Sequence, residues 1–255
     1  MHTKDELFDL MNGLKLTGML QALDEQYSSK SFSKKSFIDR MHHLLEAQQL
    51  WNENRRLSLN QKQANLRWPS AAVSDIDFEV QKSLDKDVVW NLAEMSWVEA
   101  YEHLFLNGPT GSGKTHFACA LANAAMVLGH KALFLKYSAL IALLCKASKE
   151  ESIEALYRKF NKVQLFIIDE LRPVNLEEGE DQLLFDFFES RDMKASFIFT
   201  SQYPLSDWYD DMADETIADA ILDRVVHNST TIVMNEKVSL RKVLRSKQKS
   251  YGGDE

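Results

Sequence analysis

A glycine-rich loop at residues 107–115 constrains the fold of this chain more than any other feature. The loop reads Asn-Gly-Pro-Thr-Gly-Ser-Gly-Lys-Thr, follows the short apolar segment 104–106, and opens a helical segment at 116–128. A strand, such a loop and a helix together form a phosphate-binding loop of the Walker A type, because glycines let consecutive N–H groups and the helix N-terminus face an anion. The pattern predicts an ATP site. The residues expected to cradle the nucleotide are Gly108, Pro109, Thr110, Gly111, Ser112, Gly113, Lys114, Thr115 and His116.

Two side chains of this loop carry specific chemistry. Lys114 is expected to reach the β- and γ-phosphates, and the hydroxyl of Thr115 is expected to ligate Mg²⁺. The alternative interpretation is a glycine turn that contains a lysine by chance. The strand before the loop and the helix after it favour the phosphate site.

A second candidate half-site follows about fifty residues later. The apolar run 165–168 ends in Asp169 and Glu170, which is a Walker B pattern. Ligands of parallel sheets sit beyond the carboxyl ends of the strands, so Asp169 is expected beside the loop, where it would hold magnesium through water. Glu170 would then orient and polarise the attacking water. The alternative is a buried strand that ends in two solvated acids.

The rest of the chain alternates strand-like and helix-like segments from residue 103 onward. The pattern predicts an α/β fold with a mostly parallel sheet over residues 71–255. Residues 1–70 instead show helical spacing, interrupted at Gly18 and over 28–36, and end near the proline of Trp68-Pro69. They predict a small helical N-terminal domain that contacts DNA, a partner, or both. The expected strands are His103–Leu106, Ala132–Lys136, Val163–Ile168, Ser196–Thr200 and Thr230–Met234.

Composition and charge narrow the class of protein to which this chain can belong. No apolar run approaches the roughly 20 residues that span a bilayer, and acidic residues interrupt the N-terminus where a signal peptide would need a basic and then an apolar stretch. We therefore expect a cytoplasmic protein without a membrane segment. The two cysteines, Cys119 and Cys145, lie in apolar helix-like contexts and are expected in the core. The net charge of -8 is uneven, because residues 1–70 carry +2.

Three motifs together resemble the IstB-like ATPases, which help insertion-sequence transposition and are related to the helicase loader DnaC. These motifs are the loop Gly108–His116, the acidic strand end Ile168–Glu170, and the Ala-Ile-Leu-Asp-Arg stretch at 220–224. An N-terminal Leu-Lys-Leu-Thr-Gly-Met at 14–19 is also similar to the family's opening. The resemblance implies a helical N-terminal domain before an AAA+ domain of the initiator type, here without a separate lid domain.

The resemblance also implies partners and further site residues. It implies ATP-dependent self-assembly on duplex DNA, with ATP sites between subunits and a transposase as client. Arg224 would be an arginine finger in the site of the adjacent subunit. Gln202, where the family usually has Asn, would sense the γ-phosphate, and Arg241 would do so from a Ser-Leu-Arg in place of Ser-Tyr-Arg. For Arg224 the alternative is a local pairing role at a helix end.

Basic residues are the candidates for DNA contact. No helix-turn-helix or zinc signature is present, so phosphate contacts with little sequence preference are expected. A further basic run lies at 237–249. The candidates are Lys34, Lys35, Arg40, Arg55, Arg56 and Arg67 near the N-terminus, and Lys146, Lys149, Arg158, Lys159 and Lys162 within an expected initiator-type insertion.

Two other functions fit some of these features. A helicase loader of the DnaC type would use the N-terminal domain to grip a helicase. A stand-alone nucleotide kinase would use the P-loop in a monomer. The acids at the strand end and the Arg224 motif favour a shared-site ATPase over the kinase.

Overall fold

A computed structural model of the chain describes residues 3–172, 176–177, 179–204, 215–226 and 228–235. The chain divides into two compact units, residues 1–59 and residues 60–255. Arg241 and the basic run at 237–249 lie outside the described residues. The elements before the sheet are α1 (Lys4–Gly13), α2 (Thr17–Ser28), η1 (Lys30–Lys34), α3 (Phe37–Ala64), η2 (Val73–Asp75), α4 (Lys86–Ala93) and α5 (Ser96–Glu99).

The first unit packs a small core between its helices. Thr3 caps α1 in a capping box with Glu6, which satisfies two exposed backbone N–H groups at the helix start. The core consists of Met11, Ala22, Leu23 and Leu44, with partly buried apolar side chains around it.

Gly18 was expected to separate helices, and that expectation is wrong. Gly18 lies in the first turn of α2 and is buried against α3. A Cβ on Gly18 would lie 2.5 Å from the carbonyl oxygen of Ala47 and 2.7 Å from Cβ of Trp51. The glycine is therefore a close-approach residue that lets the two helix backbones pack together.

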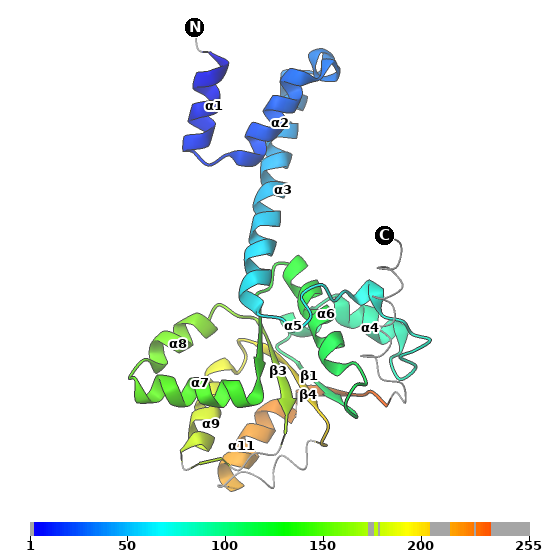
Figure 1. Cartoon of the computed structure of the whole chain (residues 1–255), viewed down its shortest axis with the longest axis vertical. Helices are drawn as coiled ribbons and strands as arrows, with labels where there is room; N and C mark the ends of the chain where they lie inside the picture. Colours follow the sequence, from blue (N-terminus) through cyan, green and yellow to red (C-terminus); the bar gives the residue numbers. More distant parts are fainter. Residues whose placement is uncertain (1–2, 173–175, 178, 205–214, 227, 236–255) are drawn as a thin grey trace, which may run out of the picture. The chain divides into compact units, whose positions relative to one another are not determined.

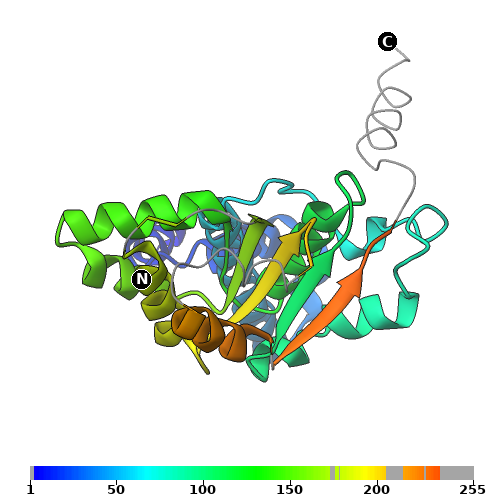
Figure 2. The same cartoon turned by 90° about the horizontal axis from the view of Figure 1, so that it is seen from below.

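The second unit is built on a five-stranded parallel sheet, which confirms the predicted α/β fold. The strand order is β2-β3-β4-β1-β5, and every neighbouring pair is parallel. Figures 1 and 2 show the sheet with helices around it. The elements are β1 (His103–Asn107), α6 (Lys114–Val127), β2 (Ala132–Lys136), α7 (Tyr137–Lys149), α8 (Ile153–Phe160), β3 (Leu165–Leu171), α9 (Glu180–Arg191), β4 (Ser196–Ser201), α11 (Glu215–Val226) and β5 (Ser229–Val233).

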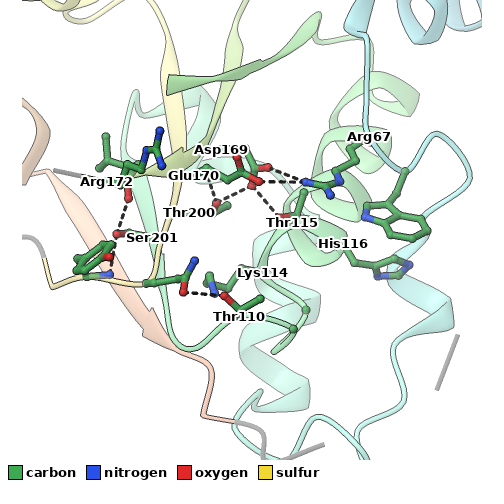
Figure 3. Close-up of a pocket in the computed structure, with 16 residues that line it drawn as sticks. Arg67, Thr110, Lys114, Thr115, His116, Asp169, Glu170, Arg172, Thr200 and Ser201 are labelled. Atoms are coloured by element: carbon green, nitrogen blue, oxygen red, sulfur yellow. Dashed lines mark hydrogen bonds and ion pairs between the residues drawn. The ribbon is translucent and has the colours of Figure 1, made fainter. Parts of the chain in front are cut away.

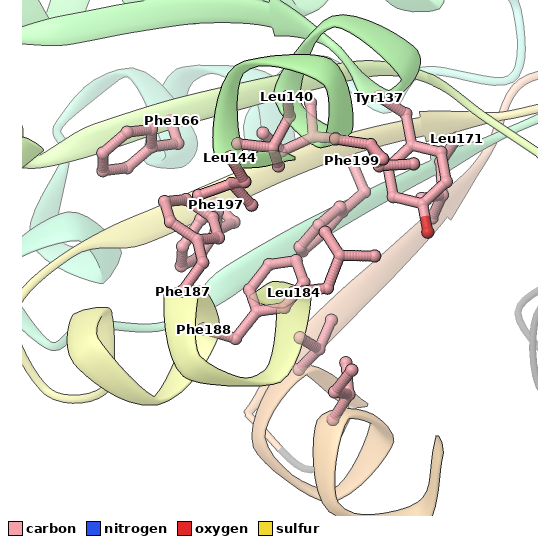
Figure 4. Close-up of a cluster of buried hydrophobic side chains, with 14 of the residues drawn as sticks. Tyr137, Leu140, Leu144, Phe166, Leu171, Leu184, Phe187, Phe188, Phe197 and Phe199 are labelled. Atoms are coloured by element: carbon pink, nitrogen blue, oxygen red, sulfur yellow. The ribbon is translucent and has the colours of Figure 1, made fainter. Parts of the chain in front are cut away.

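The strand order, with right-handed crossovers, decides which face of the sheet each helix covers. The chain crosses from β1 to β2 in one direction through α6, and it returns from β2 towards β5 through α7, α9 and α11. Right-handed connections therefore place α6 on one face of the sheet and the other three helices on the opposite face. Phenylalanines dominate the core beneath α7 and α9, where Phe166, Phe187 and Phe197 pack edge to face or stacked (Figure 4).

This topology decides where a site can form. Because all strands are parallel, the carboxyl ends of β1, β3 and β4 meet at one edge of the sheet. β4 lies between β1 and β3, so its last residues lie between the strand end that leads into the phosphate-binding loop and the strand end that carries the two acids. None of the described helices is at once long enough and apolar enough to cross a membrane.

The two cysteines differ in their surroundings. Cys119 on α6 is fully buried, and burial raises the pKa of its thiol to about 11. Cys145 on α7 is only partly buried, and its thiol donates a hydrogen bond to Glu180 Oε1 at 3.3 Å. The expectation of two core cysteines therefore holds for Cys119 and is incomplete for Cys145.

Candidate functional site

The glycine-rich loop adopts a backbone that requires glycine. Gly108, Gly111 and Gly113 have φ values of 148°, 89° and 102°, in a region that L side chains rarely adopt. A Cβ on Gly108 would also overlap the carbonyl group of Met234, just after β5. The loop is therefore fixed by local conformation and by the neighbouring strand end, and Gly113 leads directly into α6.

Lys114 lies folded into the loop. Its ammonium group donates to the carbonyl oxygens of Gly108 at 2.5 Å and Pro109 at 2.9 Å, and it lies 3.5 Å from Ser112 Oγ. The side chain is buried. A cation at this position is surrounded by loop carbonyls and is placed to meet phosphate oxygens that enter the loop.

The end of β3 departs from regular strand geometry. The register between β3 and β4 shifts between Ile168 and Leu171, and Glu170 has a φ of 59°. Side chains alternate faces in a regular strand, so adjacent acids would point apart. The irregularity re-aims them, and both Asp169 and Glu170 line one pocket beside the loop (Figure 3).

Asp169 is fully buried and receives two hydroxyl hydrogen bonds. Thr115 and Thr200 both donate to its Oδ1, at 2.7 and 2.6 Å. Its Oδ2 is buried and has no hydrogen-bond partner within the described residues. A buried carboxylate oxygen without a donor is costly unless a cation faces it, which fits a magnesium position.

The donor chemistry also fits magnesium. No cluster of three or more His, Cys, Asp or Glu side chains that could hold a metal exists in the described part of the chain. Mg²⁺ is commonly held by one or two protein oxygens together with substrate phosphates and waters. Thr115 and Asp169 supply such a pair of oxygens.

Glu170 projects into the pocket between two cations. Lys136 Nζ, at the end of β2, donates to Oε2 at 2.8 Å, and Arg67 donates to Oε1 at 3.3 Å. The hydrogen bond from Lys136, reinforced by the charges of Lys136 and Arg67, outweighs partial burial and lowers the pKa of Glu170. The carboxylate is therefore anionic at neutral pH and can accept a hydrogen bond from water.

The end of β4 supplies polar groups between the loop and the acids. Thr200 Oγ1 accepts from the backbone N–H of Glu170 at 3.2 Å while it donates to Asp169. Ser201 Oγ donates to the carbonyl oxygen of Leu171 at 2.7 Å. Gln202 Oε1 accepts from Thr110 Oγ1 at 2.6 Å, so the predicted sensor contacts the loop directly.

Sequence reasoning missed several residues of this pocket. The pocket residues Thr200, Ser201, Tyr203 and Trp68 were not singled out from the sequence, nor was Lys136, which pairs with Glu170 beside the pocket, and Arg67 was grouped with the DNA-contacting cations. The structure places Arg67 in the pocket (Figure 3). The strand end Thr-Ser-Gln at 200–202, which follows both motifs in the chain, was the available signal for the β4 residues, but no local pattern marks Lys136 or Arg67.

His116 also lines the pocket, where its ring meets Trp68 edge to face at a centroid distance of 5.9 Å. Burial lowers the pKa of His116, although Asp75 opposes this effect. The imidazole is therefore neutral at pH 7 and acts here as a packing partner of Trp68.

Arg224 contacts residues of its own chain that lie outside this pocket. Its guanidinium donates to the carbonyl oxygen of Ala220 at 3.0 Å and to Glu189 Oε1 at 3.4 Å, and it lies 4.9 Å from the ring centre of Phe185. Arg224 is absent from the described residues that line the pocket. The structure thus shows the local pairing, and a role in a neighbouring subunit stays a prediction.

The basic candidates for DNA contact differ in exposure. Arg40 is half-buried, and its Nε donates to Gln26 at 3.0 Å. Lys146 is exposed and forms only a loose pair with Glu150 at 3.9 Å. The others on α3, on α7 and α8 and in or near η1 are exposed: Lys34, Lys35, Arg55, Arg56, Lys149, Arg158 and Lys159.

Comparisons with known proteins identify the family of this chain. The family model for IstB-like ATP binding proteins matches residues 10–250. A Pseudomonas aeruginosa protein named for ATP binding in insertion sequence IS21 is 34% identical over 91% of this chain and 86% of its own length. A Sinorhizobium fredii insertion-sequence protein, also named for ATP binding, is 34% identical over 94% of this chain and 97% of its own.

Solved structures show the same fold. AMPPCP-bound DnaA from Aquifex aeolicus matches with a TM-score of 0.56 and 17% identity, over 73% of this chain and 57% of that one. The DnaC helicase loader matches with a TM-score of 0.54 and 18% identity, over 66% of this chain and 98% of that one. The chain belongs to the family of IstB-like ATP binding proteins and is a P-loop ATPase with the AAA+ fold.

Proposed function

We propose that this protein is a magnesium-dependent ATPase that assembles on duplex DNA, shares its ATP sites between subunits and serves a transposase. The observation that carries the proposal is the buried Asp169, held by Thr115 and Thr200 beside the phosphate loop with its second oxygen left for a cation. The link to transposition rests on relatives that are named for insertion sequences.

Each residue of the site has a role in this scheme. Lys114 turns from the loop carbonyls to the β- and γ-phosphates, and Thr115 and Asp169 would hold magnesium, which neutralises phosphate charge. Glu170 orients the attacking water through its anionic carboxylate, and Gln202 reports the γ-phosphate to the loop through Thr110. Hydrolysis then needs one further cation on the γ-phosphate.

That further cation is proposed to be Arg224 of the adjacent subunit. Arg224 sits at the end of α11, is partly exposed, and lies outside the pocket of its own chain as described. Its pairing with Glu189 is at the surface, so it contributes little stability and can be exchanged for a phosphate contact. A site that is complete only between subunits would make assembly depend on ATP.

DNA is proposed to bind to α7 and α8 through its backbone phosphates. Lys146, Lys149, Arg158 and Lys159 are exposed on these two helices, which follow one another in the chain. Cations on exposed helices contact phosphates without reading bases, so binding should be sensitive to salt and nearly blind to sequence.

The test combines sizing with a salt titration. Light scattering with ATP and duplex DNA should show assemblies that do not form without nucleotide. The slope of log affinity against log salt should change by roughly 0.9 for each phosphate contact removed. Reversing Lys146 and Lys149 to Glu should flatten the slope for every duplex, whereas the matched reversal of the exposed Lys82 and Lys86 should not.

Three results would redirect the proposal. A chain that stays monomeric with ATP and phosphorylates a small molecule would favour the nucleotide kinase. Tight binding of a replicative helicase, without any transposase interaction, would favour a loader. Equal salt slopes for the two charge-reversal variants would remove α7 as a DNA surface.

A further inference from the structure

Arg67 is the cation that lies nearest to Oδ2 of Asp169, the carboxylate oxygen that has no hydrogen-bond partner within the described residues. Its Nη1 lies 3.7 Å from Asp169 Oδ2 and also donates to Glu170 Oε1 at 3.3 Å. Asp169 is completely buried, whereas the Arg67 side chain is about one-third exposed. One guanidinium nitrogen therefore serves both acids of the site, from the side that opens to the pocket.

The chain around Arg67 is anchored on both sides. Leu66 is buried before it, and Trp68 packs against His116 after it. The carbonyl oxygens of Pro69 and Ala71 both accept hydrogen bonds from the side-chain amide of Asn123 on α6, at 3.0 and 2.8 Å. These contacts fix the segment 65–71 against the helix that follows the phosphate loop, and so they present the guanidinium to the acids.

The position of Arg67 conflicts with a bound divalent ion. Oδ2 of Asp169, which has no hydrogen-bond partner within the described residues, is the carboxylate oxygen proposed to face magnesium, and the Arg67 guanidinium forms an ion pair with it at 3.7 Å. Two cations beside one carboxylate oxygen repel each other strongly at a poorly solvated position. Asp169 therefore cannot bind the Arg67 guanidinium and a magnesium ion tightly at the same time.

We propose that Arg67 is a positioning residue that takes the place of magnesium in the nucleotide-free site and leaves Asp169 when magnesium binds with ATP. It keeps both acids paired in the absence of nucleotide, and its departure couples magnesium loading to a new position of the guanidinium beside the anchored segment 65–71. This inference rests on the proposed role of Asp169 in holding magnesium.

Lys136 provides a matched comparison. It contacts Glu170 at 2.8 Å, closer than Arg67 does, but its ammonium lies outside ion-pair distance of Asp169. Both side chains are partly exposed, at 47% for Lys136 and 36% for Arg67. Removing either cation takes one partner from Glu170. Only removal of Arg67 also removes a competitor of magnesium for Asp169.

The experiment measures ATP binding by calorimetry across a magnesium titration, with thermal melting to show that each variant folds. In Arg67→Gln the magnesium concentration for half-maximal tight binding should fall roughly three- to tenfold, the scale of one partly exposed charge pair. Arg67→Lys should stay near the wild type, and Lys136→Gln should not shift the requirement. An unchanged requirement in Arg67→Gln, or an equal shift in Lys136→Gln, would overturn the inference.

Two further arms separate this inference from the proposed function. If Asp169→Asn keeps the wild-type magnesium dependence, the magnesium position itself is wrong and both proposals fail. If Asp169→Asn loses that dependence while Arg67→Gln behaves as wild type, only the Arg67 inference fails. In the otherwise unaltered chain, Trp68 emission, isolated by difference from Trp68→Phe, should change when magnesium is added to the ATP-bound protein, because the guanidinium of the adjacent Arg67 moves, and no change would contradict that departure.

Discussion

The hydroxyl of Thr200 is predicted to hold the catalytic arrangement together, and Thr200→Val tests this. The side chain is 2% exposed, and its hydroxyl donates to the Asp169 carboxylate while it accepts from the Glu170 N–H. Valine keeps the shape of threonine and replaces the hydroxyl with a methyl group. The change therefore isolates these two hydrogen bonds.

The magnitude follows from what each bond contributes. A hydrogen bond to a charged group contributes about 1.5–3 kcal/mol, and a buried N–H left without an acceptor costs about 1–3 kcal/mol. Partial relaxation offsets some of this, so we expect a loss of about 3 kcal/mol in the free energy of unfolding. That loss corresponds to a fall of roughly 6–12 °C in melting temperature for a domain of this size.

Turnover should fall more than ATP affinity. The N–H of Glu170 belongs to a residue in a left-handed conformation, and Thr200 is the acceptor that fixes it. A displacement of about 1 Å in a positioning group can cost about 10²-fold in rate, whereas Lys114 and the loop remain intact. The assays are thermal unfolding, ATP calorimetry and steady-state phosphate release.

The control for this prediction is Thr200→Ser, which keeps the hydroxyl. Serine should retain most of the stability and most of the turnover. If Thr200→Val melts and hydrolyses ATP like the wild type, the hydroxyl does not position the acids and the reasoning is refuted.

Three further predictions test other parts of the molecule. Lys114→Ala removes the buried ammonium at the loop, so calorimetry should detect at most weak binding of Mg·ATP, and wild-type affinity would contradict the site. Gly18→Ala places a Cβ against Ala47 and Trp51 and should cost about 1–3 kcal/mol in urea unfolding, whereas alanine at Gly13, where no atom lies within 4 Å, should not overpack the helices. Cys119, with a thiol pKa raised to about 11, should label far more slowly with iodoacetamide at pH 8 than Cys145, as followed by mass spectrometry; equal rates would show that α6 opens readily.

Local sequence patterns predicted the fold and the two motifs that line the pocket. In each pattern a functional side chain follows residues that determine the local backbone. Glycines precede Lys114, and an apolar strand precedes Asp169. The parallel sheet then brings Thr115 and Asp169 to 2.7 Å, fifty-four residues apart in the chain. We expected Asp169 beside the loop because the carboxyl ends of parallel strands lie at one edge of the sheet.

Other residues around the two acids depend on long-range packing that no local pattern records. Lys136 reaches Glu170 because β2 and β3 pair in register, with Lys136 opposite Asp169. Arg67 reaches the acids because Asn123 and His116 hold the segment around it. A local spacing rule also misplaced Gly18, since a glycine in a helix can mark a close approach of another helix rather than a helix end.

The central claim is that the ATP site is completed by Arg224 of a second subunit, and mixing two inactive variants tests it. Glu170→Gln should bind ATP and stall hydrolysis. Arg224→Ala should bind ATP and lose turnover by roughly 10³- to 10⁵-fold, the range known for arginine fingers. At a mixed interface, the intact Glu170 of one variant meets the intact Arg224 of the other.

The decisive measurement is the ATPase rate of this mixture with DNA, beside a mixture in which the Arg224→Ala chain also carries Lys114→Ala. The account predicts that activity returns in the first mixture and stays absent in the second, because the second leaves the only complete interface without bound ATP. An inactive first mixture in which the two variants demonstrably co-assemble, or normal hydrolysis by Arg224→Ala alone, would contradict the shared site.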